Sequence, residues 1–142
     1  MAWPLVQEGD RFWPVRTVQY LLVAQGHPVD VDSDFEQRTT AAVKAFQSEH
    51  GLEPDGKVGP LTWPLLVRPV DSRSEGADVR ALQSLLTSAG LPTDITGRFT
   101  AATAHNLSSF QDTHHLPTTG QVDVRTWRVL LSAQAPPVRT VR

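Results

Sequence analysis

The chain has 142 residues, of which 39% are apolar and 20% are charged, so its composition permits a packed core and excludes a disordered protein. A net charge of −2 and a pI of about 6.2 argue against nucleic acid or an anionic membrane as an electrostatic partner. The chain has no cysteine, which excludes disulfides, thiolate metal sites and a cysteine nucleophile. No stretch has the ~20 apolar residues of a spanning helix, and no secretory signal is visible at the N-terminus.

The sequence matches itself without a gap when it is shifted by 64 positions. Gly56, Val58, Thr62, Trp63 and Leu66 recur as Gly120, Val122, Thr126, Trp127 and Leu130. Such a match indicates a duplication, so we expect two small domains. Their predicted bounds are 1–68 and 69–132, with a linker at 67–76 and a flexible tail at 133–142.

The first helix of each unit is predicted from an apolar stripe at helical spacing. In the first unit Val15, Val18 and Leu22 form this stripe, and Gly26 is placed to end the helix in a left-handed conformation. Gly90 holds the same place in the second unit. Upstream of the first helix, we expect Trp3 and Leu5 to pack onto the first bundle.

The second helix carries an apolar face that ends in a histidine in both units. Its members in the first unit are Thr39, Val43, Phe46 and His50. Gly51 suits the left-handed position that follows the helix. The second unit has His115 there, which adopts a positive φ less readily than glycine.

The third helix is short, and its tryptophan is expected to close the bundle. Pro64 should shorten this helix in the first unit, because proline removes a backbone donor. In the second unit Asp123 is a good N-cap. We therefore predict an all-α protein made of two tandem three-helix bundles, with Trp63 and Trp127 in their cores.

Two pairs of glutamines lie on otherwise apolar helix faces, which makes them the most informative polar residues. They are Gln19 with Gln83, and Gln47 with Gln111. A buried amide needs hydrogen-bond partners. Either each amide ties a neighbouring turn to its helix, or Gln47 and Gln111 reach a groove and bind a sugar or peptide amide.

Metal and catalytic sites are weakly supported by the sequence. The acidic run 30–36 resembles the start of a calcium loop, but Phe35 and Ala41 stand where that loop needs Gly and Glu, which favours a solvated turn. The five histidines form no HExxH or similar zinc frame. No GxSxG elbow is present, so we expect no catalytic residues, no metal, no cofactor and no enzymatic activity.

Taken together, these segments resemble the bacterial peptidoglycan-binding domain family of small three-helix modules. The first unit gives "VRTVQYLL", "DSDFEQRT", "AVKAFQSEHGL" and "DGKVGPLTWPLL". The second unit gives "VRALQSLL", "TGRFTAAT", "NLSSFQDTHHL" and "TGQVDVRTW". The family usually has glycine where the first unit has Ser33 and Glu36. The second unit departs further, with Thr96, Thr100, Thr119 and Asp123 in place of Asp, Gly, Asp and Gly.

The resemblance implies a noncatalytic module that binds peptidoglycan, through its glycan strand or its stem peptide, outside the cell or in the cell wall. Such modules are commonly attached to wall hydrolases, so a hydrolase or an assembly partner is also implied. The first unit keeps the family's "DGKVG" and is the better candidate for binding. Its predicted ligand-facing residues are Asp34, Arg38, Gln47, Asp55 and Lys57.

Two other hypotheses remain open from the sequence. The chain could be a protein–protein adaptor or docking subunit that reuses this fold in a larger secreted or phage-like assembly. It could also be a wall hydrolase with an unrecognised site. The duplication itself has two explanations, which are avidity for a polymer and mutual stabilisation of two small bundles.

Overall fold

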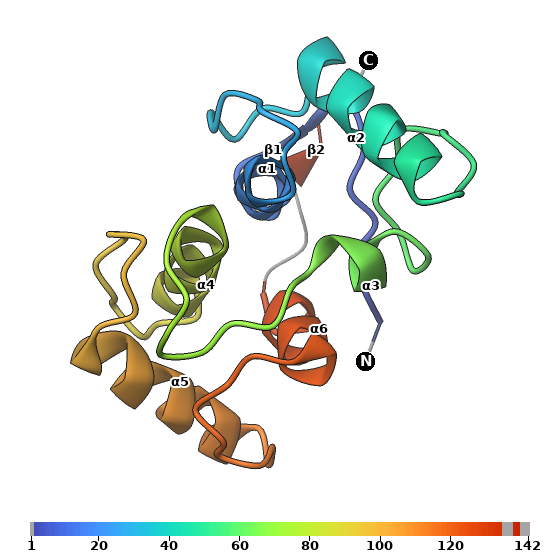
Figure 1. Ribbon diagram of the computed structural model, residues 1–142. Coiled ribbons are helices and arrows are strands. Elements are labelled where there is room, and N and C mark those ends of the chain that lie inside the picture. The colour runs from blue at the N-terminus through green and yellow to red at the C-terminus, as the bar shows by residue number, and fades with distance from the viewer. Residues whose placement is uncertain (1, 135–137, 140–142) are drawn as a thin grey trace.

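The computed structural model describes residues 2–134 and 138–139, and its described part contains six helices in two sets of three (Figure 1). Module 1 has α1 (Val15–Ala24), α2 (Gln37–Glu49) and α3 (Trp63–Leu66). Module 2 has α4 (Ala77–Ser88), α5 (Ala101–Thr113) and α6 (Val124–Ser132). The prediction of two tandem three-helix units is confirmed.

The first two helices of each module end as their sequences predict. The backbone at Gly26 and Gly90 has φ of 85° and 88°, the left-handed conformation that glycine adopts without strain. His115 adopts the same conformation with φ of 57°, where Gly51 has 72°. These residues let the chain reverse directly after each helix and return toward the bundle.

The third helix differs in length and in capping between the modules. Pro64 lies within the four residues of α3, whereas α6 extends over nine residues and begins with a capped turn. The cap is Asp123, whose carboxylate accepts a hydrogen bond of 2.8 Å from the backbone N–H of Thr126. Both third helices still bury their tryptophan completely.

An extended segment precedes the first helix of each module and anchors the tryptophan. The indole N–H of Trp63 donates to the carbonyl of Pro4 over 2.7 Å, and that of Trp127 donates to the carbonyl of Arg68 over the same distance. Val6 pairs with Val58, as Val70 pairs with Val122. Each structural unit therefore begins about ten residues before its helical motif.

This pairing corrects the prediction of a linker at 67–76. Val67 and Val70 are 5% and 1% exposed, so the start of this segment contributes to the core, whereas Arg68, Pro69 and most of 71–76 lie at the surface. The predicted division between residues 68 and 69 falls inside it and is not tested. Upstream, Trp3 stacks on Trp63 with ring centroids 6.0 Å apart, as expected, and Leu5 is 45% exposed, with its side chain lying beside Gly59 of module 1.

The two modules pack against each other through their first helices. In Figure 1, α1 and α4 adjoin at the centre, and α2 and α5 lie on opposite outer sides. Thr17 and Leu21 lie off the stripe that faces the module 1 core, yet both are buried, and so are their counterparts Ala81 and Leu85. We infer that these four residues form the contact between the modules.

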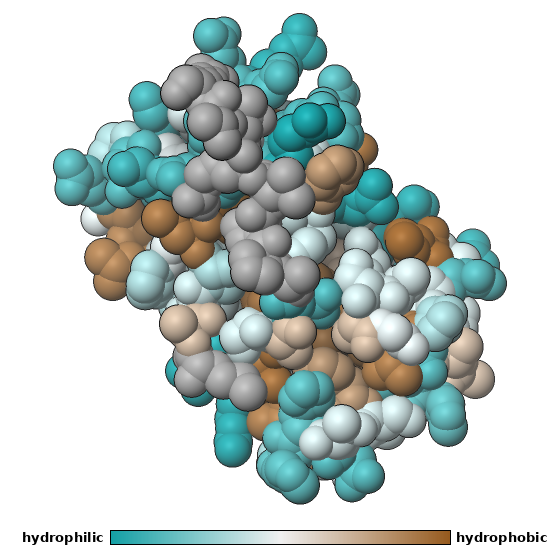
Figure 2. Space-filling model, turned by 180° about the vertical axis from the view of Figure 1, so that it is seen from behind, coloured by the Kyte–Doolittle hydropathy of each residue, from teal (hydrophilic) through white to brown (hydrophobic). Residues whose placement is uncertain are grey.

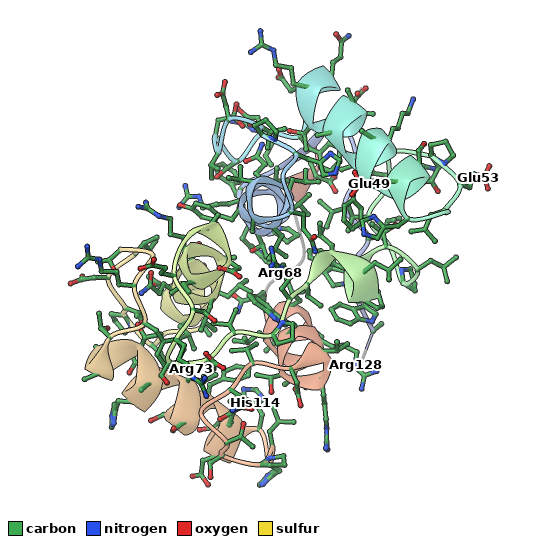
Figure 3. All side chains as sticks on the ribbon, viewed as in Figure 1. Glu49, Glu53, Arg68, Arg73, His114 and Arg128 are labelled. Atoms are coloured by element: carbon green, nitrogen blue, oxygen red, sulfur yellow. The ribbon has the colours of Figure 1, made fainter. Side chains whose placement is uncertain are left out.

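Arg68 connects the two modules through both its side chain and its backbone. Its guanidinium donates a hydrogen bond of 2.8 Å to the carbonyl of Ala24 at the end of α1, while its own carbonyl accepts the indole N–H of Trp127. Figure 3 shows Arg68 near the centre of the molecule, between the two sets of helices. The buried residues of both modules form one continuous apolar core.

A short two-stranded pairing involves the C-terminal part of the chain. β1 (Asp10–Arg11) pairs antiparallel with β2 (Val138–Arg139). Residues 138 and 139 thus differ from the flexible tail predicted for 133–142, and the rest of that tail after residue 134 lies outside the described residues. Within the described chain, no helix is both long and apolar enough to cross a membrane.

Candidate functional site

Two buried glutamines of module 1 each hold one surface turn against a helix. The amide nitrogen of Gln19 donates to the carboxylate of Asp32, the carbonyl of Asp34 and the hydroxyl of Thr39 over 3.0–3.2 Å. Its amide oxygen accepts from the backbone N–H groups of Asp32 and Ser33. Every hydrogen-bonding position of this buried amide is therefore used to shape the turn between α1 and α2.

Gln47 makes the same arrangement with the turn between α2 and α3. Its amide nitrogen donates to the Asp55 carboxylate, the Lys57 carbonyl and the Thr62 hydroxyl over 2.8–3.1 Å. Its amide oxygen accepts from the N–H of Gly56 over 2.9 Å. The structural interpretation of Gln47 is supported, because the 2% exposed side chain has no donor left for a ligand.

Module 2 repeats both arrangements with threonine in place of aspartate. Gln83 donates to the hydroxyl of Thr96, and Gln111 donates to that of Thr119, over 3.4 and 3.5 Å. The same hydroxyls accept from the backbone two residues later, as the carboxylates do in module 1. The departures of module 2 from the family pattern at these positions keep the turn and remove its negative charge.

The two turn aspartates of module 1 are held in their ionised form. The N–H of Asp34 is the largest cause that lowers the pKa of Asp32, followed by the amide of Gln19. The N–H of Lys57 is the largest cause that lowers the pKa of Asp55. A hydrogen bond to the charged form favours that form, so both turns keep their negative charge.

The turn before α2 opens into a hollow of about 370 Å³ with a strongly acidic lining. The lining residues are Glu8, Asp30, Asp32, Asp34, Glu36, Gln37, Arg38 and Thr39. Glu8 is brought here by the extended N-terminal segment, and its carboxylate accepts a hydrogen bond of 2.9 Å from Thr40 on α2. Hydrophilic surface dominates the upper end of the molecule in Figure 2, at the height of α2 in Figure 1.

A second hollow of about 560 Å³ lies beside the first and shares Asp30 and Arg38 with it. Its other lining residues are Gly26, His27, Pro28, Val29, Ala41 and Ala42. The Arg38 guanidinium lies 4.0 Å from the Asp30 carboxylate, and both side chains are largely exposed. The two hollows together follow the N-terminal half of α2.

The structure brings together only some of the predicted ligand-facing residues. Asp34 and Arg38 both line the acidic hollow, and Asp34 is paired with Arg11 over 3.3 Å. Gln47 is buried, and Asp55 and Lys57 belong to the turn that it holds, outside the lining of either hollow. The predicted set thus divides into a pair that lines the acidic hollow, a buried amide that holds a turn, and two exposed residues of that turn whose ligand contact stays a prediction.

Sequence reasoning missed several residues of the acidic hollow. The sequence shows an acidic run that contains Asp30, Asp32 and Glu36. We compared this run only with a calcium-binding loop and interpreted it as a solvated turn, not as part of a hollow. No signal in the sequence pointed to Glu8, since it enters through the pairing of Val6 with Val58. Among the described residues, no three His, Cys, Asp or Glu side chains are grouped to hold a metal ion.

His50 and His114 occupy equivalent places at helix ends. A ring nitrogen of His50 lies 2.9 Å from the carbonyl of Phe46. The imidazoles lie against Phe46 and Phe110, with ring centroids 4.1 and 4.2 Å apart. This supports the prediction that the repeated histidine is a helix-end residue.

Comparison with family models decides the identity of the fold. The family described as "Putative peptidoglycan binding domain" matches this chain twice, at residues 14–66 and 75–130. The chain belongs to this family. Both peptidoglycan-binding domains thus coincide with the helical parts of modules 1 and 2.

Several proteins are similar to parts of this chain. An uncharacterized protein in the bpoA1 3′ region of Kitasatospora aureofaciens is 44% identical over 63 residues, covering 42% of this chain and 52% of that protein. A peptidoglycan-binding protein from Clostridioides difficile, solved with glutamine hydroxamate, is 37% identical over 44% of this chain and 39% of its own, with a TM-score of 0.43. The Burkholderia AP3 phage endolysin is 32% identical over 75% of this chain and 38% of its own, with a TM-score of 0.44. The chain therefore spans about half or less of each relative.

Proposed function

We propose that this chain binds bacterial peptidoglycan without cleaving it, mainly through the surface of module 1 along α2. The observation that carries the proposal is the double family match, at residues 14–66 and 75–130. The two adjoining hollows of module 1 supply a surface with both acidic and basic groups. Such a surface on loops held by a rigid bundle suits binding.

The state of the turn carboxylates supports a noncatalytic role. A general acid that works near neutral pH needs a raised pKa, because it must hold its proton until the reaction. Asp32 instead has a lowered pKa, and its carboxylate holds the amide of Gln19 and the N–H of Asp34. The Asp32 carboxylate therefore stabilises the turn through these hydrogen bonds, which suits a structural role and not that of a general acid.

The proposed location of the chain is the cell wall or the space outside the cell, where its ligand lies. Because the chain spans only part of its relatives, its association with a wall hydrolase or an assembly partner is part of the same proposal. Under this proposal the duplication serves either avidity for a polymer or mutual stabilisation of the two small modules.

A pull-down with isolated sacculi tests the proposal directly. The full chain should sediment with sacculi at moderate salt, and dye-labelled sacculi should release no dye even at high protein concentration. Protein that stays in the supernatant would contradict binding, and released dye would contradict the noncatalytic role. If the chain does not bind sacculi but co-purifies with a partner protein at fixed stoichiometry, the adaptor hypothesis is favoured instead.

A further inference from the structure

Where module 1 has a groove along α2, a hydrogen-bonded side chain crosses the same place in module 2. Ala42 lies in the lining of the second hollow, and its counterpart in α5 is Asn106. The amide of Asn106 donates to the carbonyl of Pro92 over 3.0 Å and to the hydroxyl of Thr93 over 2.7 Å. This side chain ties the loop before α5 to the helix, across the position that Ala42 leaves open.

The charged ends of the groove also differ between the modules. Arg38 and Asp30 stand where the two hollows of module 1 meet, and the acidic hollow begins beyond them. The counterpart of Arg38 in module 2 is Ala102, and that of Asp32 is Thr96. Module 1 thus combines an open groove with an exposed guanidinium and a group of carboxylates.

These charges distinguish between the two components of peptidoglycan. The sugars of the glycan strand carry no free charge once the stem peptide is attached, so carboxylates and a guanidinium attract them little. A stem peptide carries free carboxylates and, in many walls, the ammonium group of a diamino acid. Arg38 presents the forked donors that match a carboxylate, and the acidic hollow suits an ammonium group.

We propose that the groove of module 1 binds the stem peptide of peptidoglycan, with a peptide carboxylate at Arg38 and the diamino-acid ammonium in the acidic hollow. The proposal rests on the proposed function and specifies its ligand. Ala41 and Ala42 form the side of the groove on α2, where their small side chains let an extended peptide approach the helix. Module 2 then contributes stability to the chain and has no peptide site.

Three probes separate this proposal from the proposed function. They are intact sacculi, glycan strands stripped of their peptides by an amidase, and soluble stem peptide with a free diamino-acid ammonium. The full chain should bind sacculi and the soluble peptide but not the stripped strands. Equal binding to sacculi and stripped strands would overturn the peptide assignment alone. Binding to none of the three probes would overturn peptidoglycan binding itself.

Two variants of the full chain locate the site. Ala42→Asn places the module 2 side chain in the groove and should weaken binding to the soluble peptide by about tenfold, because it occupies the peptide's position. Asn106→Ala is its matched control in module 2 and should leave that affinity unchanged. A thermal melt of each variant distinguishes a closed groove from lost folding.

The exposed arginine provides a test that does not depend on packing. Arg38→Ala should weaken peptide binding by about two- to fivefold, the range of one exposed ion pair. Arg125→Ala makes the same charge change on the exposed surface of α6 and should have no effect. Peptide affinities that stay unchanged in both Ala42→Asn and Arg38→Ala would remove the site from this groove.

Discussion

The two modules share one architecture but differ in the chemistry of their turns. Gln19 and Gln83 make corresponding contacts, yet the carboxylate of Asp32 accepts in module 1 where the hydroxyl of Thr96 accepts in module 2. Asp55 and Thr119 differ in the same way. A turn needs an acceptor at this position, and either group provides one. The turn's shape therefore places no requirement on its charge.

A second pair of positions exchanges charge between the modules. Arg11 forms a backbone bridge with Asp34 in module 1, and the corresponding bridge in module 2 joins Glu75 to Arg98. The backbone pairing is the same while the signs of the side chains are reversed. The fold therefore tolerates changes of surface charge that would alter binding, so one module can keep a ligand site after the other has lost it.

The largest expected effect comes from removing a core tryptophan. Trp63→Ala and Trp127→Ala should each lower the free energy of unfolding by about 3–5 kcal/mol, since both rings are fully buried. Because α1 packs on α4, either variant should shift one common unfolding transition, measured by denaturant titration with circular dichroism. Two separate transitions, with one left unshifted, would show that the modules fold independently.

Truncating the turn glutamines should have the next largest effect. Gln47→Ala leaves the N–H of Gly56 and the hydroxyl of Thr62 without this partner, which costs about 1–3 kcal/mol. Gln111→Ala should cost less, because its bond to Gly120 is 3.3 Å long where the Gln47 bond to Gly56 is 2.9 Å. Chemical denaturation of both variants checks the order, and the reverse order would contradict it.

The left-handed turn residue before α2 and α5 offers a smaller test. Gly97 has φ of 79°, and an added Cβ would lie 2.9 Å from Nε of Arg80. Gly97→Ser should therefore destabilise the chain by about 1 kcal/mol. The reciprocal Ser33→Gly relieves a φ of 66° but loses the 3.0 Å bond from Arg16, so the melting temperature should change little. A melting temperature unchanged by Gly97→Ser would contradict this account.

The smallest effect is an acid sensitivity confined to module 1. Asp32 and Asp55 have pKa values lowered in the folded state, so they bind protons more weakly there than in the unfolded chain. Their contribution to the free energy of unfolding is present above the pKa that these carboxyls have in the unfolded chain. It is lost as the pH falls through their pKa in the folded state. The double variant Asp32→Thr with Asp55→Thr should lose less stability than wild type between pH 7 and pH 3. Equal losses, measured by denaturant titration at each pH, would contradict the assignment.

Much of the site's supporting structure was predictable, and its outline was not. The places of Gln19 and Gln47 on apolar faces gave the hypothesis that these amides tie turns to helices, which their hydrogen bonds support. Asp34 and Arg38 were among the predicted ligand-facing residues, and both line a hollow. Glu8 was not predictable, because a residue without local periodicity reaches α2 only through strand pairing. The open groove at Ala42 was also not predictable. An alanine on a helix is common, and no sequence motif indicates that its small side chain leaves a groove beside the helix.

The duplication, the helices, their ends and the short third helix of module 1 were all predicted from the sequence. These features depend on local spacing and on the conformational limits of glycine and proline, which act within a few residues. The burial of Val67 and Val70, the packing of α1 on α4 and the contacts of Arg68 with both modules follow from the tertiary structure. Those contacts join segments far apart in the chain, and the burial that stabilises them exists only once both surfaces have met.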